Sequence, residues 1–194
     1  MTCAGQVALV TGAGRGIGRA TAMAFARAGA MVALAARRAG ELVEVAAAIG
    51  AEGGQAVAVP TDVSRRADVA AMVERVLDRF GRLDALVTCA AAPPAVGPSE
   101  TLPLDAWQNV VGVDLTGTFL TCQAAGAAML ARGSGRIVNV TSFHAVATYP
   151  ERAAYAAAKA GVVGLTQALA VEWSGRGVTV NAVAPGPVDR KSVV

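Results

Sequence analysis

Short apolar runs alternate with longer amphipathic stretches along this chain. Runs rich in Val, Leu and Ala indicate strands buried on both faces, as in parallel sheets. The predicted strands are Gln6–Val10, Met31–Ala36, Ala56–Val59, Ala85–Val87, Ile137–Val140 and Val178–Val183. Helices are predicted between them, up to Ala28, up to Ile49, and over Arg66–Phe80, Asp105–Ala131 and Ala153–Trp173. This alternation predicts an α/β fold with a doubly wound parallel sheet of the Rossmann type, in three α/β/α layers and one domain over residues 1–194.

A glycine-rich turn follows the first predicted strand and precedes the first helix, at residues 11–18 (Thr-Gly-Ala-Gly-Arg-Gly-Ile-Gly). Such a turn lets the backbone approach a phosphate closely, and a helix N-terminus favours negative charge. The spacing differs from G-x-G-x-x-G, and the turn lacks the Gly-Lys-Ser/Thr ending of nucleotide hydrolases. The alternative is a turn without a ligand, but its place between strand and helix favours a phosphate site.

Two arginines, Arg37 and Arg38, follow the second predicted strand. NAD-preferring sites usually place a carboxylate about 20 residues after the glycines, where it holds the ribose hydroxyls. Guanidinium groups instead match a 2′-phosphate with paired hydrogen bonds, and Arg15 in the glycine turn can reach the same phosphate. These residues predict a preference for NADP(H) over NAD(H). The alternative is that both arginines are ordinary surface charges.

Tyr155 and Lys159 stand four residues apart in a predicted helix, thirteen positions after Ser142. Positions i and i+4 share a helix face, so the phenol and the ammonium point into one site. A free tyrosine has a pKa near ~10, and a neighbouring ammonium favours its phenolate form. Taken alone, this pair is a weak signal that is more typical of a solvated helix face, and its weight comes from the upstream motifs.

Taken in order, these motifs resemble those of the short-chain dehydrogenase/reductase family, from Gly5 to about Asp189. The resemblance implies that the glycine turn binds the cofactor pyrophosphate and that Asp62 contacts adenine. It also implies that the Asn-x-x-x-Pro-Gly segment beginning at Asn181 leads to the nicotinamide. The implied cofactor-binding residues are Thr11, Gly12, Arg15, Gly16, Ile17, Gly18, Arg37, Arg38, Asp62, Val63, Ala90, Tyr155, Lys159, Pro185, Gly186 and Val188.

The resemblance also implies hydride transfer between the nicotinamide and a carbonyl or alcohol carbon. Tyr155 would donate or remove the hydroxyl proton, and Ser142 would hydrogen-bond the substrate oxygen. Lys159 would favour the phenolate and hold the nicotinamide ribose hydroxyls. Asp114 stands where the family has a fourth catalytic residue, an asparagine. Because a carboxylate only accepts hydrogen bonds, we expect a contact between Asp114 and Lys159 that affects the catalytic rate.

Two further departures from the family pattern affect what is expected of the chain. Residues 88–91 read Thr-Cys-Ala-Ala where the family has Asn-Asn-Ala-Gly, so Thr88 keeps a polar side chain and the alanines leave room beside the cofactor. The chain also ends at Val194, with Arg190 where a threonine is common, whereas family members run to roughly 250 residues. We therefore expect a C-terminally truncated or partial member that lacks the last strand and the substrate lid.

Two functions follow from these expectations. The first is an NADP(H)-dependent ketone reductase or alcohol dehydrogenase, close to the 3-oxoacyl-thioester reductases. The alternative is a truncated nucleotide-binding fragment with little or no catalytic activity. The only histidine, His144, is expected to be a loop residue that lines the substrate pocket without a catalytic role. The family resemblance also implies a homodimer that pairs through the two longest helices, 105–131 and 153–173.

Composition and charge exclude several classes of protein but do not identify a substrate. A net charge of +3 spread along the chain gives no sign of nucleic-acid binding. Alanine inflates the hydrophobic fraction of 54%, and charged residues interrupt the long helices, so no membrane span is predicted. The N-terminus lacks the basic region of a secretory signal. Three cysteines without metal-like spacing fit reduced thiols in the cytoplasm, and no metal is expected.

Overall fold

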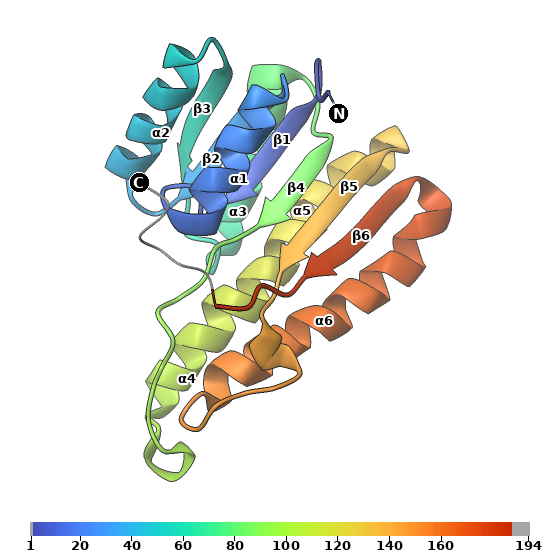
Figure 1. Ribbon diagram of the computed structural model, residues 1–194. Coiled ribbons are helices and arrows are strands. Elements are labelled where there is room, and N and C mark those ends of the chain that lie inside the picture. The colour runs from blue at the N-terminus through green and yellow to red at the C-terminus, as the bar shows by residue number, and fades with distance from the viewer. Residues whose placement is uncertain (1, 188–194) are drawn as a thin grey trace.

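The computed structural model describes residues 2–187 of the chain. Its centre is a six-stranded parallel sheet in the order β3-β2-β1-β4-β5-β6, so the strand order reverses between β1 and β4 (Figure 1). The strands are β1 (Val7–Thr11), β2 (Met31–Ala36), β3 (Gln55–Pro60), β4 (Ala85–Thr88), β5 (Gly135–Val140) and β6 (Val178–Val183). The predicted doubly wound α/β fold is confirmed. Ligands of such sheets bind at the carboxyl ends of the strands, beside this reversal point.

Helices cover the two faces of the sheet in separate groups, because each face has its own buried core. α1 (Gly16–Arg27) and α2 (Ala39–Ala51) pack on one face. The other face carries α3 (Arg66–Phe80), α5 (Gly117–Arg132) and α6 (Ala153–Trp173), and a short helix, α4 (Leu104–Val111), precedes α5 (Figure 1). Helix α6 matches its predicted bounds, as do α3, β2 and β6.

Apolar side chains of the central strands form the interior between these layers. Leu9 on β1 and Leu86 on β4 belong to the core under α3 and α5, whereas Leu34 on β2 belongs to the core under α1 and α2. All three are fully buried. Fully burying a leucine stabilises the fold by roughly 1.5–3 kcal/mol. This interior fixes the carboxyl ends of the strands, from which the site residues project.

One predicted element differs from the structure in a way that matters for the site. The single helix expected over residues 105–131 is divided by a π-helical turn, Gly112–Thr116, between α4 and α5. Asp114 lies in this turn and is completely buried. Such turns are rare and are often found at functional sites, because they re-aim one side chain within a continuous helix.

Helix α6 with the turn that follows it, Ala153–Arg176, is long and apolar enough to cross a membrane by length and composition alone. In the structure α6 lies against the sheet, its lysine is buried beside β5, and one third of its apolar window is covered. These contacts are those of a helix of the domain itself.

Candidate active site

The glycine-rich turn between β1 and α1 has a backbone that side chains would not fit. Gly12 has φ of +65°, and an added Cβ would lie 2.7 Å from the Cys89 carbonyl oxygen. A Cβ on Gly18 would overlap the Gly12 carbonyl, so the first turn of α1 packs directly on the loop. Thr11 is buried, and its Oγ1 accepts a hydrogen bond of 3.2 Å from the Ala90 N–H. The turn is therefore held against the end of β4, and its backbone lies at the carboxyl ends of the strands.

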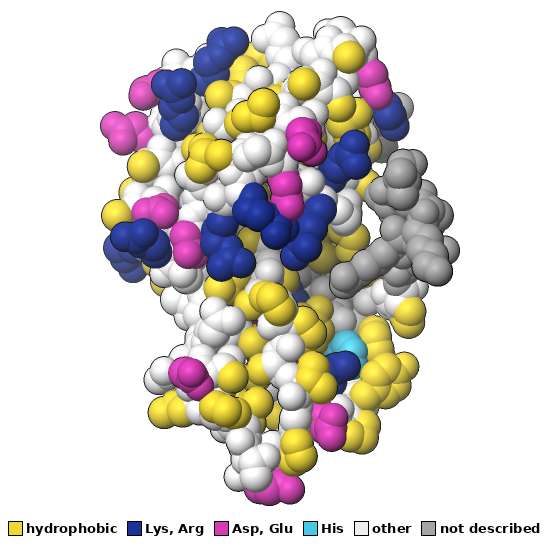
Figure 2. Space-filling model, turned by 90° about the vertical axis from the view of Figure 1, so that its left-hand side faces the viewer, with side chains coloured by type: hydrophobic (Ala, Val, Ile, Leu, Met, Phe, Trp, Pro, Cys, Tyr) yellow, Lys and Arg dark blue, Asp and Glu magenta, His cyan; other side chains and the backbone are white. Residues whose placement is uncertain are grey.

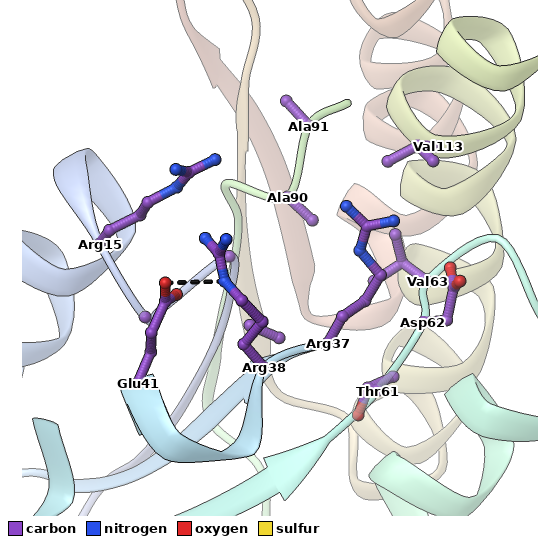
Figure 3. A pocket seen from close by; sticks show the side chains of 13 residues that line it. Arg15, Arg37, Arg38, Glu41, Thr61, Asp62, Val63, Ala90, Ala91 and Val113 are labelled. Carbon is purple, nitrogen blue, oxygen red and sulfur yellow. Dashed lines mark ion pairs between the residues drawn. The ribbon is translucent and has the colours of Figure 1, made fainter. Parts of the chain in front are cut away.

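A cavity of about 370 Å³ opens above this turn (Figure 3). Of the residues predicted to bind the cofactor, seven line it: Gly12, Arg15, Arg37, Arg38, Asp62, Val63 and Ala90. The lining also contains Ala91, one of the alanines expected to leave room beside the cofactor, and residues for which no such role was predicted: Gly14, Ala36, Glu41, Thr61 and Val113. The cavity therefore joins the ends of β1, β2, β3 and β4 to the π-helical turn.

Three exposed arginines surround the mouth of this cavity, and Figure 3 shows Arg15, Arg37 and Arg38 converging on it. Arg38 forms an ion pair of 2.7 Å with Glu41, three residues later in α2. No carboxylate pairs with Arg15 or Arg37 within salt-bridge distance in the described part of the chain. Figure 2 shows lysine and arginine side chains gathered beside a hollow on this side of the molecule. The mouth is therefore a place of positive potential.

Asp62 lies across the cavity at the end of β3. Its Oδ1 accepts hydrogen bonds from the Ser64 N–H and hydroxyl, at 3.0 and 2.7 Å. These bonds, with a smaller contribution from Arg37, lower the pKa of the Asp62 carboxyl against the effect of burial. Asp62 is therefore an oriented carboxylate that can accept hydrogen bonds at this end of the cavity.

The predicted catalytic residues lie on β5, α6 and the turn between them. Ser142 is buried two residues after the end of β5, and Lys159 is 4% exposed on α6. The Lys159 Nζ donates a hydrogen bond of 3.2 Å to the Val140 carbonyl and lies 5.6 Å from the centre of the Tyr155 ring. The phenol and the ammonium therefore share one face of α6, as their spacing predicted.

The turn after Ser142 carries a small aromatic group beside Tyr155. The His144 ring meets the Tyr155 ring edge to face with centres 5.5 Å apart, and its Nδ1 lies 2.9 Å from the Thr148 hydroxyl. The Phe143 N–H donates to the Pro185 carbonyl at 3.2 Å, which brings the Pro-Gly segment beside the same turn. These contacts place His144 next to Tyr155 and leave its role as a pocket residue a prediction.

Asp114 connects the catalytic group to the cavity. Its Oδ1 accepts a hydrogen bond of 2.7 Å from the Ala92 N–H, just beyond the cavity-lining Ala91, and its Oδ2 lies 3.4 Å from the Lys159 Nζ. Burial raises the pKa of the Asp114 carboxyl, and Lys159 opposes that rise. The contact between Asp114 and Lys159 expected from the sequence is present.

Other predicted residues have different surroundings. The Thr88 hydroxyl points into the core, where it donates a hydrogen bond of 2.9 Å to the Asn139 Oδ1, so it does not line the cavity. Gly16 and Ile17 are exposed at the start of α1 and lie outside the cavity lining. Val188 and Arg190, for which roles were considered, lie outside the described residues. Glu41 could have been noticed from its i,i+3 spacing to Arg38.

Two curated relatives show how far the likeness extends. A D-threitol dehydrogenase of Mycolicibacterium smegmatis is 43% identical over 181 residues, which are 93% of this chain and 69% of that protein. A 3-oxoacyl-[acyl-carrier-protein] reductase of Synechocystis is 45% identical over 186 residues, which are 93% of this chain and 73% of that protein. The chain thus spans about 70% of the length of these relatives.

Solved structures agree with the fold over nearly all of the chain. An NAD⁺-bound xylitol dehydrogenase matches with a TM-score of 0.92 and 33% identity, over 94% of this chain and 70% of that one. A Beutenbergia cavernae protein with bound NADP, assigned as an NAD(P)-dependent gluconate 5-dehydrogenase, matches with a TM-score of 0.90 and 46% identity, over 97% and 74%.

The family described as short chain dehydrogenase matches residues 6–193 of the sequence. This match agrees with the glycine turn, the sheet order and the placement of Ser142, Tyr155 and Lys159. The chain belongs to the short-chain dehydrogenase/reductase family and is an oxidoreductase of carbonyl and alcohol groups.

Proposed function

We propose that this oxidoreductase interconverts a ketone and a secondary alcohol with NADP(H), using Tyr155 as the acid and base. The observation that carries the proposal is the placement of the Tyr155 phenol and the Lys159 ammonium on one face of α6. The buried contact of Asp114 with both Ala92 and Lys159 connects this pair to the segment that lines the glycine-floored cavity.

Each side chain has a separate part in the proton transfer. In alcohol oxidation the Tyr155 phenolate removes the hydroxyl proton as the C–H bond breaks and the C=O bond forms; in reduction the phenol returns that proton to the alkoxide. Ser142, fixed at the end of β5, donates a hydrogen bond to the oxygen on which charge develops. Lys159 is held by the Val140 carbonyl, so its charge lies in a fixed position near the phenol.

The cavity fits a dinucleotide at its glycine floor. A side chain on Gly12 would collide with the backbone at Cys89, and one on Gly18 with the Gly12 carbonyl, so these glycines let the turn pack closely where a phosphate would approach the start of α1, which favours negative charge. When bound, the nicotinamide accepts or supplies the hydride that the substrate carbon loses or gains. Family relatives with bound NAD⁺ and with bound NADP both occur, so the choice of cofactor rests on this chain's own residues.

The three arginines support a preference for NADP(H). Arg15 and Arg37 have no carboxylate partner in the described part of the chain and so are free to bind a 2′-phosphate. Glu41 holds Arg38 over the cavity mouth, which orients its guanidinium and offsets part of its charge. We therefore assign 2′-phosphate binding mainly to Arg15 and Arg37.

The second part of the proposal concerns assembly and setting. The outward faces of α5 and α6 expose apolar side chains, Phe119 at 37% and Val171 at 83%, and we propose that two copies pair through these helices. The three cysteines are free thiols, which supports a cytoplasmic setting. Light scattering of the purified chain and of Val171→Asp tests the pairing. A monomer in both cases would contradict it.

Substrate identity is proposed only as a class. The 45% identity to a 3-oxoacyl-[acyl-carrier-protein] reductase supports testing 3-oxoacyl thioesters first, with diketones and polyols beside them. NADPH consumption with this panel, measured together with NADPH binding, tests the proposed function. Turnover that Tyr155→Phe abolishes supports it. Binding without turnover, unchanged in Tyr155→Phe, would instead identify the chain as a nucleotide-binding module.

A further inference from the structure

Asp114 is a carboxylate with two different neighbours at the base of the catalytic group. It lies in the π-helical turn and has no exposed surface. Its Oδ1 is used by the Ala92 N–H, at 2.7 Å. Its Oδ2 has no hydrogen-bond partner among the described residues and lies 3.4 Å from the Lys159 Nζ. One oxygen therefore holds the backbone next to the cavity, and the other faces the lysine.

The contact with the Ala92 N–H requires an oxygen acceptor but no negative charge. An asparagine in the same position would present a carbonyl oxygen to the Ala92 N–H equally well. What the carboxylate adds is a negative charge opposite the ammonium, in a place where water does not screen it. A residue kept only for the loop hydrogen bond would not need that charge.

We propose that Asp114 is a positioning residue that offsets the charge of Lys159, so that proton transfer at Tyr155 operates at a higher pH than it would with an amide at residue 114. The physical reason is that an ammonium favours the neighbouring phenolate, whereas a carboxylate disfavours it. Its meaning for catalysis rests on the proposed function, but the charge effect is a property of the folded chain and is measurable without substrate.

Few other titratable groups face these residues. His144 meets the Tyr155 ring, and Cys89 lies near Lys159 with its thiol pKa raised to about 12 by burial, against the effect of Lys159. Neither carries a negative charge below that range, so Asp114 is the anion that opposes Lys159 among the described residues. Phenols titrate near pH ~10, and Lys159 opposes the rise that burial gives to the pKa of the Asp114 carboxyl.

A phenolate titration tests the proposal directly. The chain has two tyrosines, so Tyr149→Phe leaves Tyr155 as the single phenol and keeps an aromatic ring at residue 149. The near-ultraviolet absorbance of the phenolate is followed against pH in this variant, with and without Asp114→Asn. We expect Asp114→Asn to lower the midpoint by about one pH unit, which is a tenfold rise in the phenolate-to-phenol ratio at a given pH.

Asp105→Asn in the same background is the matched control, because it removes one exposed carboxylate from the first turn of α4. We expect it to leave the midpoint unchanged. A midpoint that Asp114→Asn leaves in place or raises would overturn the proposal. Should Asp114→Asn not fold, Asp114→Ser keeps an acceptor for the Ala92 N–H, and the same lowering is expected of it.

The catalytic consequence has its own readout. If the enzyme turns over, the acid side of its pH profile for alcohol oxidation should move to lower pH in Asp114→Asn by the same amount. If the unaltered chain shows no turnover although Asp114→Asn lowers the phenolate midpoint, only the proposed function is contradicted. An unmoved pH profile together with an unmoved midpoint would overturn the role of Asp114.

Discussion

The two charged clusters at the carboxyl edge of the sheet differ in their contact with water. Arg15 and Arg37 are exposed at the cavity mouth, whereas Lys159 is 4% exposed and Asp114 is fully buried. Exposed charges are hydrated and screened, so each one changes the affinity for a partner by a modest amount. A buried pair acts at full strength on its neighbours and is costly to break. The exposed cluster therefore suits the selection of a cofactor, and the buried one suits the control of a proton.

The sharpest test of the buried cluster is Tyr155→Phe. The phenol is proposed to carry the proton, and such a group contributes roughly 10²–10⁴-fold to the rate. We expect kcat to fall by that range while the NADPH dissociation constant is unchanged, measured by steady-state kinetics and fluorescence titration. Tyr149→Phe is the control and should keep its kcat. A Tyr155→Phe enzyme with full kcat would remove the phenol from the mechanism.

Breaking the buried pair should cost stability in a pH-dependent way. Lys159→Met leaves the Asp114 carboxylate unpaired, and breaking such a pair costs about 3–5 kcal/mol. Burial raises the pKa of Asp114, so the folded variant binds a proton more tightly than the unfolded chain. Stability is then lost as pH rises through that raised pKa and recovered as pH falls.

Urea unfolding of Lys159→Met between acid and neutral pH measures this difference. Asp114→Asn combined with Lys159→Met should largely remove the pH dependence, because no buried carboxyl remains there. A loss that is the same at every pH would show that the unpaired charge is not its cause.

Asp84 lies at the amino end of β4, on the side of the sheet opposite the cavity, and its contribution to stability should depend on pH in the opposite direction. Burial opposes the ionised form of Asp84, but hydrogen bonds from Arg82, the Val7 N–H and Arg132 outweigh it and lower the pKa of its carboxyl. Its contribution is therefore complete above the ordinary carboxyl pKa and lost as pH falls through the lowered one. Asp84→Asn should cost about 1–3 kcal/mol at neutral pH, by urea unfolding. The exposed Asp78→Asn should cost nothing measurable.

The smallest effect is expected at the exposed cluster. Arg37→Ala removes one guanidinium from the cavity mouth, and we expect NADPH to bind about tenfold more weakly, since a bond to a charged group is worth roughly 1.5 kcal/mol. NADH binding should not change. Arg66→Ala is the control, because Arg66 begins α3, bonds Gln123 and does not line the cavity. Equal weakening of both cofactors would mean that Arg37 does not contact the 2′-phosphate.

The sequence alone was enough for the sheet, for the place of the arginines and for the shared face of Tyr155 and Lys159, because these depend on local patterns. Buried strands read as apolar runs, and the four-residue spacing of Tyr155 and Lys159 places both on one helix face. Arg15 follows β1, and Arg37 and Arg38 follow β2, so the parallel strands bring all three arginines to the cavity.

The remaining features depend on contacts between distant residues. The apolar pattern of residues 105–131 fits a continuous helix, so it gave no sign of the π-helical turn that buries Asp114. Thr88 was expected to keep a hydrogen-bonding side chain, and its partner proves to be Asn139 on the neighbouring strand, a pairing that no local pattern reveals. The convergence of Arg82 and Arg132 on Asp84 was missed for the same reason.

The division of work between the two clusters is tested most directly by one crossed series. The NADPH dissociation constant and the kcat at saturating NADPH are measured for the unaltered chain, Arg37→Ala and Tyr155→Phe. We predict that Arg37→Ala raises only the dissociation constant and that Tyr155→Phe lowers only kcat. If both variants changed both quantities alike, the two clusters would not have separate roles and the account would be wrong.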